Sequence, residues 1–87
     1  MEELLQETVV LDAHGTYVYV GRLTRIESDF LVLEDCDAHD LRDSPTTTRE
    51  QYVLRCREHG VVVNRRRVYV ARQEVVAVSC LADVIVC

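Results

Sequence analysis

The stretch TVVLDAHGTYVYVGRLTRIES, residues 8–28, holds the pattern that decides the fold. Its first part, Thr8–Ala13, has the composition of a strand, and Gly15 supplies a tight turn because glycine readily takes positive φ. A long strand over Tyr17–Ser28 is expected next. Its apolar alternation changes phase at Gly21, and a glycine at such a point indicates a bulge or a sharp bend. A strand bent in this way can serve two sides of a small barrel.

Three more strands are expected downstream. Phe30–Glu34 is nearly all apolar and is therefore predicted to be buried on both faces or at an interface. The polar segment Asp35–Thr48 contains the only proline and is typical of a loop. The last two strands, Arg66–Arg72 and Val75–Leu81, are separated by only two residues. The apolar tail, residues 82–87, needs a surface on which to pack.

Two short helices are predicted beside these strands. Residues 1–7 favour a short helix, which must dock on the rest of the chain because a helix of this length is unstable alone. Thr47 and Glu50 have the spacing of a capping box, which predicts a helix over Arg49–His59 that ends at a glycine. A strand over Tyr52–Arg57 is the alternative.

The element order predicts a mainly β fold in a single domain, residues 1–87. This length suffices for one domain and is too small for two. Five short, strongly bent strands close most easily into a small barrel of the SH3 type, and closure removes the exposed edges of an open sheet. Residues 36–64 form an excursion from this barrel. Because a chain of this size buries only about 60% of its unfolded surface, association is favoured.

The composition excludes several classes of protein. No apolar run reaches the roughly 18–20 residues of a membrane helix, and the acidic N-terminus is unlike a secretory leader, so we expect a cytoplasmic protein without a membrane partner. The cysteines at positions 36, 56, 80 and 87 include no C-x-x-C pair and are expected to be reduced. Common enzyme motifs are absent, so no catalytic residue, metal or cofactor is expected.

Charge is unevenly distributed along the chain. The net charge is −5, and all ten basic residues are arginine. Residues 1–48 hold eleven acidic side chains and three arginines, whereas residues 49–87 hold four acidic side chains and seven arginines. The negative total argues against a broad cationic surface that coats nucleic acid, so any such contact must come from a local patch.

Two clusters of charged residues are candidate binding sites. The arginines at 65–67 can bind RNA phosphates, or they can pair with the acidic segment of the same or a neighbouring chain, which the surplus of acids favours. Residues 34–40, EDCDAHD, gather four carboxylates, a thiol and an imidazole. They suit a divalent cation but lack the spacing and glycine of an EF-hand loop, so a solvated acidic loop is the preferred interpretation.

The order of elements and two motifs resemble the Sm-like (LSm) family, the small barrels of eukaryotic Sm proteins and bacterial Hfq. Residues 9–23, VVLDAHGTYVYVGRL, are similar to the first signature of that family, with an apolar strand, a turn glycine and a G-x-L in the bent second strand. Residues 30–35, FLVLED, resemble its third strand, and residues 70–78, VARQEVVAV, resemble its second signature. Segment 36–64 lies outside the resemblance and corresponds to an enlarged fourth loop.

The resemblance implies a cyclic homo-oligomer. Family members assemble into rings by pairing the fourth strand of one subunit with the fifth strand of the next. Independently, two apolar strands joined by a tight turn at the end of a small domain need cover, which pairing with another strand provides. The side chains expected at this interface are Val68, Tyr69, Val70, Val75, Val76 and Val78.

The sequence departs from the family where RNA is bound. Sm proteins have an Asp before the third strand and an Asn in it that recognises a base, and the matching positions here are Ile26 and Phe30. The arginine of the second signature is matched by Arg72, but the glycine that follows it is Gln73 here. What remains is Arg72 for phosphate or stacking and Phe30 as a stacking face.

The sequence therefore predicts a non-catalytic Sm-like protein that forms a homo-oligomeric ring and binds single-stranded RNA with little base specificity. The candidate RNA-binding residues are Arg72, Arg65, Arg66, Arg67 and Phe30. The alternative is a ring-forming scaffold that binds protein and no RNA. A small metal-dependent enzyme at residues 34–40 is the third hypothesis.

Overall fold

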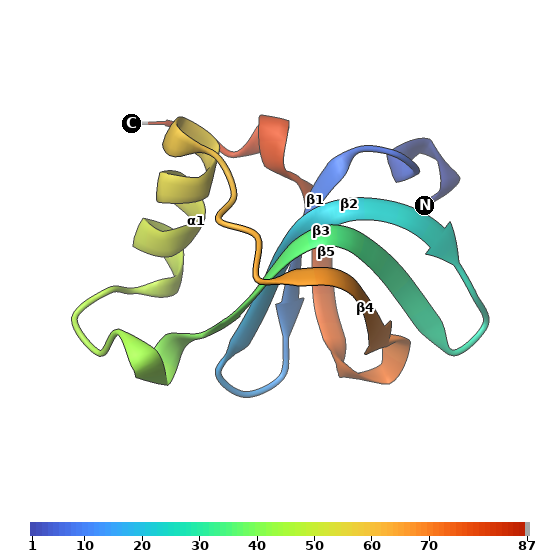
Figure 1. Ribbon diagram of the computed structural model, residues 1–87, viewed down its shortest axis with the longest axis horizontal. Helices are drawn as coiled ribbons and strands as arrows, with labels where there is room; N and C mark the ends of the chain where they lie inside the picture. Colours follow the sequence, from blue (N-terminus) through green and yellow to red (C-terminus); the bar gives the residue numbers. More distant parts are fainter. Residues whose placement is uncertain (87) are drawn as a thin grey trace.

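The computed structural model describes residues 1–86, which contain a five-stranded antiparallel sheet (Figure 1). The strands are β1 (Thr8–Ala13), β2 (Tyr17–Ile26), β3 (Phe30–Asp40), β4 (Arg65–Ala71) and β5 (Val75–Cys80), and the helix α1 (Arg49–His59) stands between β3 and β4 in the chain. Short 3₁₀ turns occupy residues 2–4, 41–43, 72–74 and 81–83. No helix within residues 1–86 is long and apolar enough to cross a membrane.

The strand order in the sheet is β4-β3-β2-β1-β5, so β4 and β5 are its two edges. The sheet curls strongly, and the prediction of a mainly β, five-stranded, bent fold is confirmed (Figure 1). The expectation that closure removes both edges is wrong, because in the described part of the chain no strand pairing joins β4 to β5. Each edge strand therefore presents main-chain donors and acceptors that no second strand of the same chain pairs.

Gly21 lies where β2 and β3 approach each other closely. A Cβ atom at this position would stand 2.9 Å from both Cα and Cβ of Cys36 and 3.2 Å from the carbonyl oxygen of Glu34. The register of the β2–β3 pair shifts between Val20 and Arg22. The predicted irregularity at Gly21 is therefore confirmed, and its cause is the close approach of two strands, since Gly21 does not have positive φ.

Apolar side chains are buried in two clusters on opposite faces of the sheet. Alternation along β1 places Val9 and Leu11 in one cluster and Val10 in the other. The first cluster lies inside the curl and consists of Val9, Leu11, Leu23, Leu31, Leu33, Cys36 and Val70. The second joins the outer face of β1 and β2 to α1 and consists of Val10, Val18, Val20, Tyr52 and Cys56. The tail contributes Val84 to the second cluster, so part of it packs as expected.

A buried polar network fixes the excursion to β3. Asp37 is buried and accepts hydrogen bonds from the Tyr52 hydroxyl at 2.6 Å and from Asn64 Nδ2 at 2.9 Å. The side-chain oxygen of Asn64 accepts a third bond, from the main-chain N–H of Ala38 at 2.9 Å. His39 stacks on Tyr52 with ring centroids 4.0 Å apart. Burial and the bond to Asp37 raise the pKa of the Tyr52 hydroxyl far above its ordinary value, so Tyr52 remains a donor.

β3 is longer than the sequence predicts. The expected strand ends at residue 34, but β3 continues to Asp40, so the acid-rich residues 34–40 are strand and not loop. Their charges are satisfied locally: Asp40 accepts from Thr16 Oγ1 at 2.8 Å and from the Arg42 guanidinium at 2.7 Å. These bonds from Arg42 hold the pKa of Asp40 far below its usual range.

The helix predicted over residues 1–7 is reduced to the 3₁₀ turn Glu2–Leu4. It ends there because Gln6 takes a φ of 71°, outside the helical region, and donates its main-chain N–H to the carbonyl of Leu23 at 2.7 Å. The N-terminal segment is therefore pinned to β2 by main-chain bonding.

α1 has the bounds expected of a helix, and the alternative strand over residues 52–57 is wrong. The capping box stands one residue later than predicted. Thr48 accepts from the N–H of Gln51, and Gln51 accepts in return from the N–H of Thr48, in place of Thr47 and Glu50. Three consecutive threonines precede this helix, so the spacing alone did not determine which of them is the N-cap residue.

Candidate nucleic-acid interface

Arg72 follows the last residue of β4 and is held against the turn between β2 and β3. Its main-chain N–H donates to the carbonyl oxygen of Asp29 at 2.9 Å, and its Nη1 donates to the carbonyl oxygen of Glu27 at 2.9 Å. The turn itself is closed by the N–H of Glu27, which donates to the carbonyl of Phe30 at 2.9 Å. Because one corner of the guanidinium is fixed, its remaining N–H groups are held in one orientation.

Phe30 begins β3 beside this anchored arginine. It pairs with Ala71 across the β3–β4 ladder, so it lies one residue away from Arg72 at the same end of the sheet. Its ring is exposed and meets the exposed ring of Tyr69 edge to face, with centroids 6.3 Å apart and planes at 85°. An exposed aromatic face is a surface on which a nucleobase can stack.

Arg72 and Phe30 border one open pocket of about 430 Å³, where the β2–β3 and β4–β5 connections meet. Its lining residues are Ser28, Asp29, Phe30, Ala71, Arg72 and Gln73. The pocket offers one cation, one carboxylate and an aromatic ring. The structure thus brings together the two residues that the family resemblance singled out.

The arginine cluster 65–67 lies at the other end of β4. Arg65 pairs with Cys36, whereas Phe30 pairs with Ala71. Along an extended strand, the seven steps from Arg65 to Arg72 span up to about 23 Å. The predicted RNA-binding set is therefore divided between two places.

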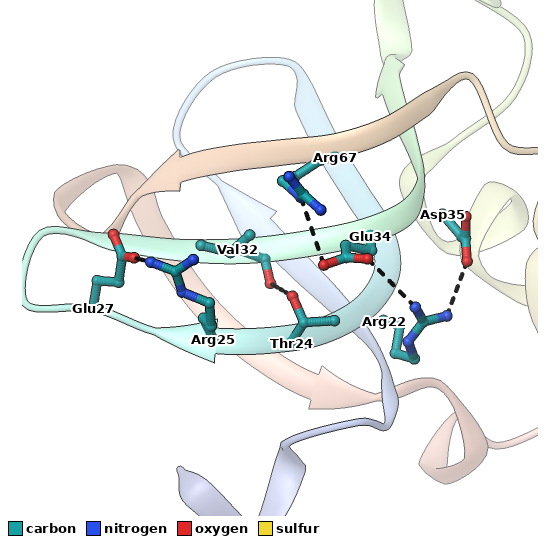
Figure 2. Close-up of polar contacts among 8 residues, drawn as sticks. All are labelled: Arg22, Thr24, Arg25, Glu27, Val32, Glu34, Asp35 and Arg67. Atoms are coloured by element: carbon teal, nitrogen blue, oxygen red, sulfur yellow. Dashed lines mark hydrogen bonds and ion pairs between the residues drawn. The ribbon is translucent and has the colours of Figure 1, made fainter.

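Arg67 belongs to a ladder of ion pairs across the outer face of β2, β3 and β4 (Figure 2). Its Nε stands 3.6 Å from a carboxylate oxygen of Glu34, and the other Glu34 oxygen stands 3.6 Å from Arg22. Arg22 also binds Asp35 at 2.9 Å. The two positive charges of the arginines balance the two negative charges of the carboxylates. This supports the interpretation in which Arg67 pairs with the acidic segment. All three arginines of the cluster are exposed.

Strand geometry separates the acidic groups of residues 34–40. Successive side chains point to opposite faces, and Asp37 and Asp40 are already engaged in hydrogen bonds. Within residues 1–86, no group of three or more His, Cys, Asp or Glu side chains is placed to hold a metal ion. The hypothesis of a cation site or metal-dependent enzyme at this segment thus has no geometric support.

The described cysteines are free thiols: Cys36, Cys56 and Cys80. Burial raises the pKa of the Cys36 thiol to about 12, so it stays protonated at neutral pH. Cys87 lies outside the described residues.

The side chains expected at a subunit interface differ in burial. Tyr69 and Val76 are exposed. Three others are half-buried against the cluster inside the curl: Val68, Val75 and Val78. Val70 is buried in that cluster, because strand alternation turns its side chain inward.

Known proteins are similar to this chain in fold rather than in sequence. No family model and no curated protein matches the sequence. A solved Sm protein of Pyrococcus abyssii, in complex with a uridine heptamer, is similar in structure, with a TM-score of 0.61 and 17% identity over 91% of this chain and 89% of that chain. The fold is Sm-like. The resemblance carried by residues 9–23, 30–35 and 70–78 is therefore confirmed at the level of fold.

Two features of this pocket were not visible in the sequence. Arg72 is anchored by the main-chain carbonyl of Glu27, and a main-chain acceptor leaves no trace in residue type. Tyr69, which was predicted for a subunit interface, also contacts Phe30 within one copy. The signal that could have shown this was the β3–β4 register, because aromatic residues placed diagonally across two strands reach one another.

Proposed function

We propose that the protein is a single-domain, non-catalytic Sm-like protein that forms a homo-oligomeric ring and binds single-stranded RNA. The RNA-binding site is the pocket between the β2–β3 and β4–β5 connections. The observation that carries this proposal is the anchored guanidinium of Arg72 beside the exposed ring of Phe30. Arg72 contacts a phosphate, and Phe30 stacks on a base. The uridine heptamer bound to the Pyrococcus abyssii Sm protein supports RNA as the ligand.

Binding is expected to discriminate weakly between bases. Phosphates and aromatic stacking faces are common to all nucleotides, and neither contact reads a base edge. The exposed Arg65 and Arg66 supply further phosphate contacts away from the pocket, whereas Arg67 supplies less because Glu34 already pairs with it. Because these contacts are made to phosphates, binding should weaken as the salt concentration rises.

The edges of the sheet support ring formation. β4 and β5 stand at opposite ends of the strand order and are not paired with each other. An antiparallel pairing of β4 in one copy with β5 in the next would supply both edges with partners and cover the exposed Tyr69 and Val76.

Fluorescence anisotropy with oligo(U) and oligo(A) at about 50 mM salt tests the RNA site, because phosphate contacts are strong under these conditions. Arg72→Ala should weaken binding at least about tenfold, the loss typical of a charge-assisted hydrogen bond. Arg55→Ala, on the exposed side of α1, removes the same charge outside the pocket and should bind nearly as well as the wild type.

The salt dependence separates a phosphate contact from a structural effect. The slope of log affinity against log salt should be shallower by about 0.7 in Arg72→Ala, because this arginine neutralises one phosphate of a single strand. Equal reductions in affinity in Arg72→Ala and Arg55→Ala would contradict the assigned site. An absence of binding to either RNA would favour the ring-forming scaffold that binds protein.

A further inference from the structure

Exposed apolar residues stand beyond both edges of the sheet. In the segment between α1 and β4, Val62 is 79% exposed and Val63 is 50% exposed. In the tail after β5, Ile85 is 81% exposed and Val86 is 49% exposed. Large apolar side chains grouped beside open strand edges indicate surfaces that a partner covers.

The two segments begin at opposite edges of the sheet, at the two ends of one row of neighbouring residues. Arg65, the first residue of β4, pairs with Cys36, which lies directly against Gly21. Gly21 pairs with Val9, and Val9 pairs with Cys80, the last residue of β5. These five residues form one row that crosses the whole sheet from edge to edge.

The chain between this row and the apolar residues has a similar length on both edges. Extended chain rises about 3.3 Å per residue, so Val62 can lie up to about 10 Å from Arg65. On the other edge, the 3₁₀ turn Leu81–Asp83 rises only about 2.0 Å per residue, so Ile85 can lie up to about 13 Å from Cys80. If β4 of one copy pairs antiparallel with β5 of another so that the rows align, the two apolar segments leave the paired strands on the same side and can meet.

The tail borders an apolar pocket beside β5 that is suited to receive such side chains. Its volume is about 450 Å³, and its lining includes Val10, Val53, Leu54, Ser79, Val84 and Ile85. An ion pair between Asp12 and Arg49, at 3.3 Å, borders it on the polar side. Aliphatic side chains from a second chain would remove this apolar lining from water.

The charges beside the two edges are complementary. Arg65 and Arg66 are exposed at the start of β4. Near the end of β5, two exposed carboxylates, Glu7 and Asp83, stand against one arginine, Arg57, so the local charge is negative. Arg57 and Glu7 line a second, smaller pocket. Pairing the rows of two copies therefore places a positive edge against a negative one.

We propose that Val62 and Val63 of one copy pack on the tail and apolar pocket of a second copy, as a clasp beside the pairing of β4 with β5. This inference rests on the proposed ring and names the surface that closes each junction. The occupant is the same chain because it carries the complementary edge, the matching spacing and the opposite charge. Val61 packs under α1, which directs the two residues after it away from the core of their own copy.

Size-exclusion chromatography with light scattering, over a range of protein concentrations, tests the clasp. Val62→Asp and Ile85→Arg should each raise the concentration of half-dissociation at least about tenfold, since each removes apolar burial. The double variant should recover most of this loss, because the introduced charges have opposite sign. Leu5→Asp is the matched control, since Leu5 is an exposed apolar residue near the N-terminus, and it should assemble normally.

Circular dichroism should show that both single variants fold, because Val62 and Ile85 are largely exposed within one copy. Single variants that assemble like the wild type would overturn the clasp and leave the ring standing. A wild-type chain that is monomeric at every concentration would overturn both the ring and the clasp. RNA binding is measured separately by anisotropy. If the clasp variants lose assembly while Arg72→Ala still weakens RNA binding by the same factor, the result supports the clasp and does not bear on the RNA site.

Discussion

Replacing Gly21 with alanine tests the close approach of β2 and β3 that shapes the sheet. The added Cβ would stand 2.9 Å from two atoms of Cys36, whereas carbon atoms pack best at about 3.5–4.0 Å. One of these atoms is a main-chain Cα, which no change of rotamer can move. The strands must therefore separate. We expect the free energy of unfolding to fall by about 2–3 kcal/mol, the upper part of the range for overpacked cores. This corresponds to a decrease of about 8–24 °C in Tm.

Urea denaturation followed by far-ultraviolet circular dichroism measures this change, with protein concentration held fixed because the proposed assembly would add stability. Cys36→Gly removes one of the two clashing atoms, so it should cost less in the Gly21→Ala background than in the wild type. Cys36→Ala keeps both clashing atoms and should give no such relief. A Gly21→Ala variant within about 0.5 kcal/mol of the wild type would refute the reasoning, because that is the scatter of neutral surface substitutions.

Three further predictions concern groups that the fold buries or pairs. Tyr52→Phe removes a donor from the buried carboxylate of Asp37 and should lower the free energy of unfolding by about 1–3 kcal/mol in urea denaturation. Arg42→Ala should destabilise the protein near neutral pH: Arg42 depresses the pKa of Asp40 in the folded chain, and a depressed carboxyl pKa stabilises the fold above the unfolded value of about 3.9. This difference from the wild type should shrink as the pH falls below about 4. Thermal denaturation at several pH values measures it, and a difference of constant size down to low pH would contradict the prediction. Because burial raises its pKa to about 12, the Cys36 thiol should resist alkylation in the native protein and react after unfolding, as mass spectrometry of the labelled peptide can establish.

The sequence was sufficient for the strands that have a clear local signal. The strand-like composition of Thr8–Ala13 corresponds to β1, and the phase change at Gly21 corresponds to a shift in the β2–β3 register. The second half of β3 was not predictable in this way. Asp37 is polar by residue type but becomes a buried strand residue only because Tyr52 and Asn64, distant in sequence, donate hydrogen bonds to it.

The candidate site was predictable in part, for a similar reason. Arg72 and Phe30 stand at positions of the family signatures, and the β3–β4 register brings them together. The cluster at residues 65–67 has the composition of a phosphate site, but its position along β4 places it far from Arg72. In addition, Arg67 is already paired with Glu34. Composition shows which groups are present, whereas register determines which of them share a surface.

The two edges of the sheet are different strands, β4 and β5, and this difference limits how copies of the chain could assemble. A copy that docks its β4 on the β5 of a neighbour leaves one vacant β5 and one vacant β4 at the far ends of the pair. Each addition would reproduce the same two vacancies, so the proposed head-to-tail assembly would stop only when the last copy met the first. The angle between successive copies would then set the number of subunits. An angle that does not close the circle would give an open filament instead of stopping at a dimer.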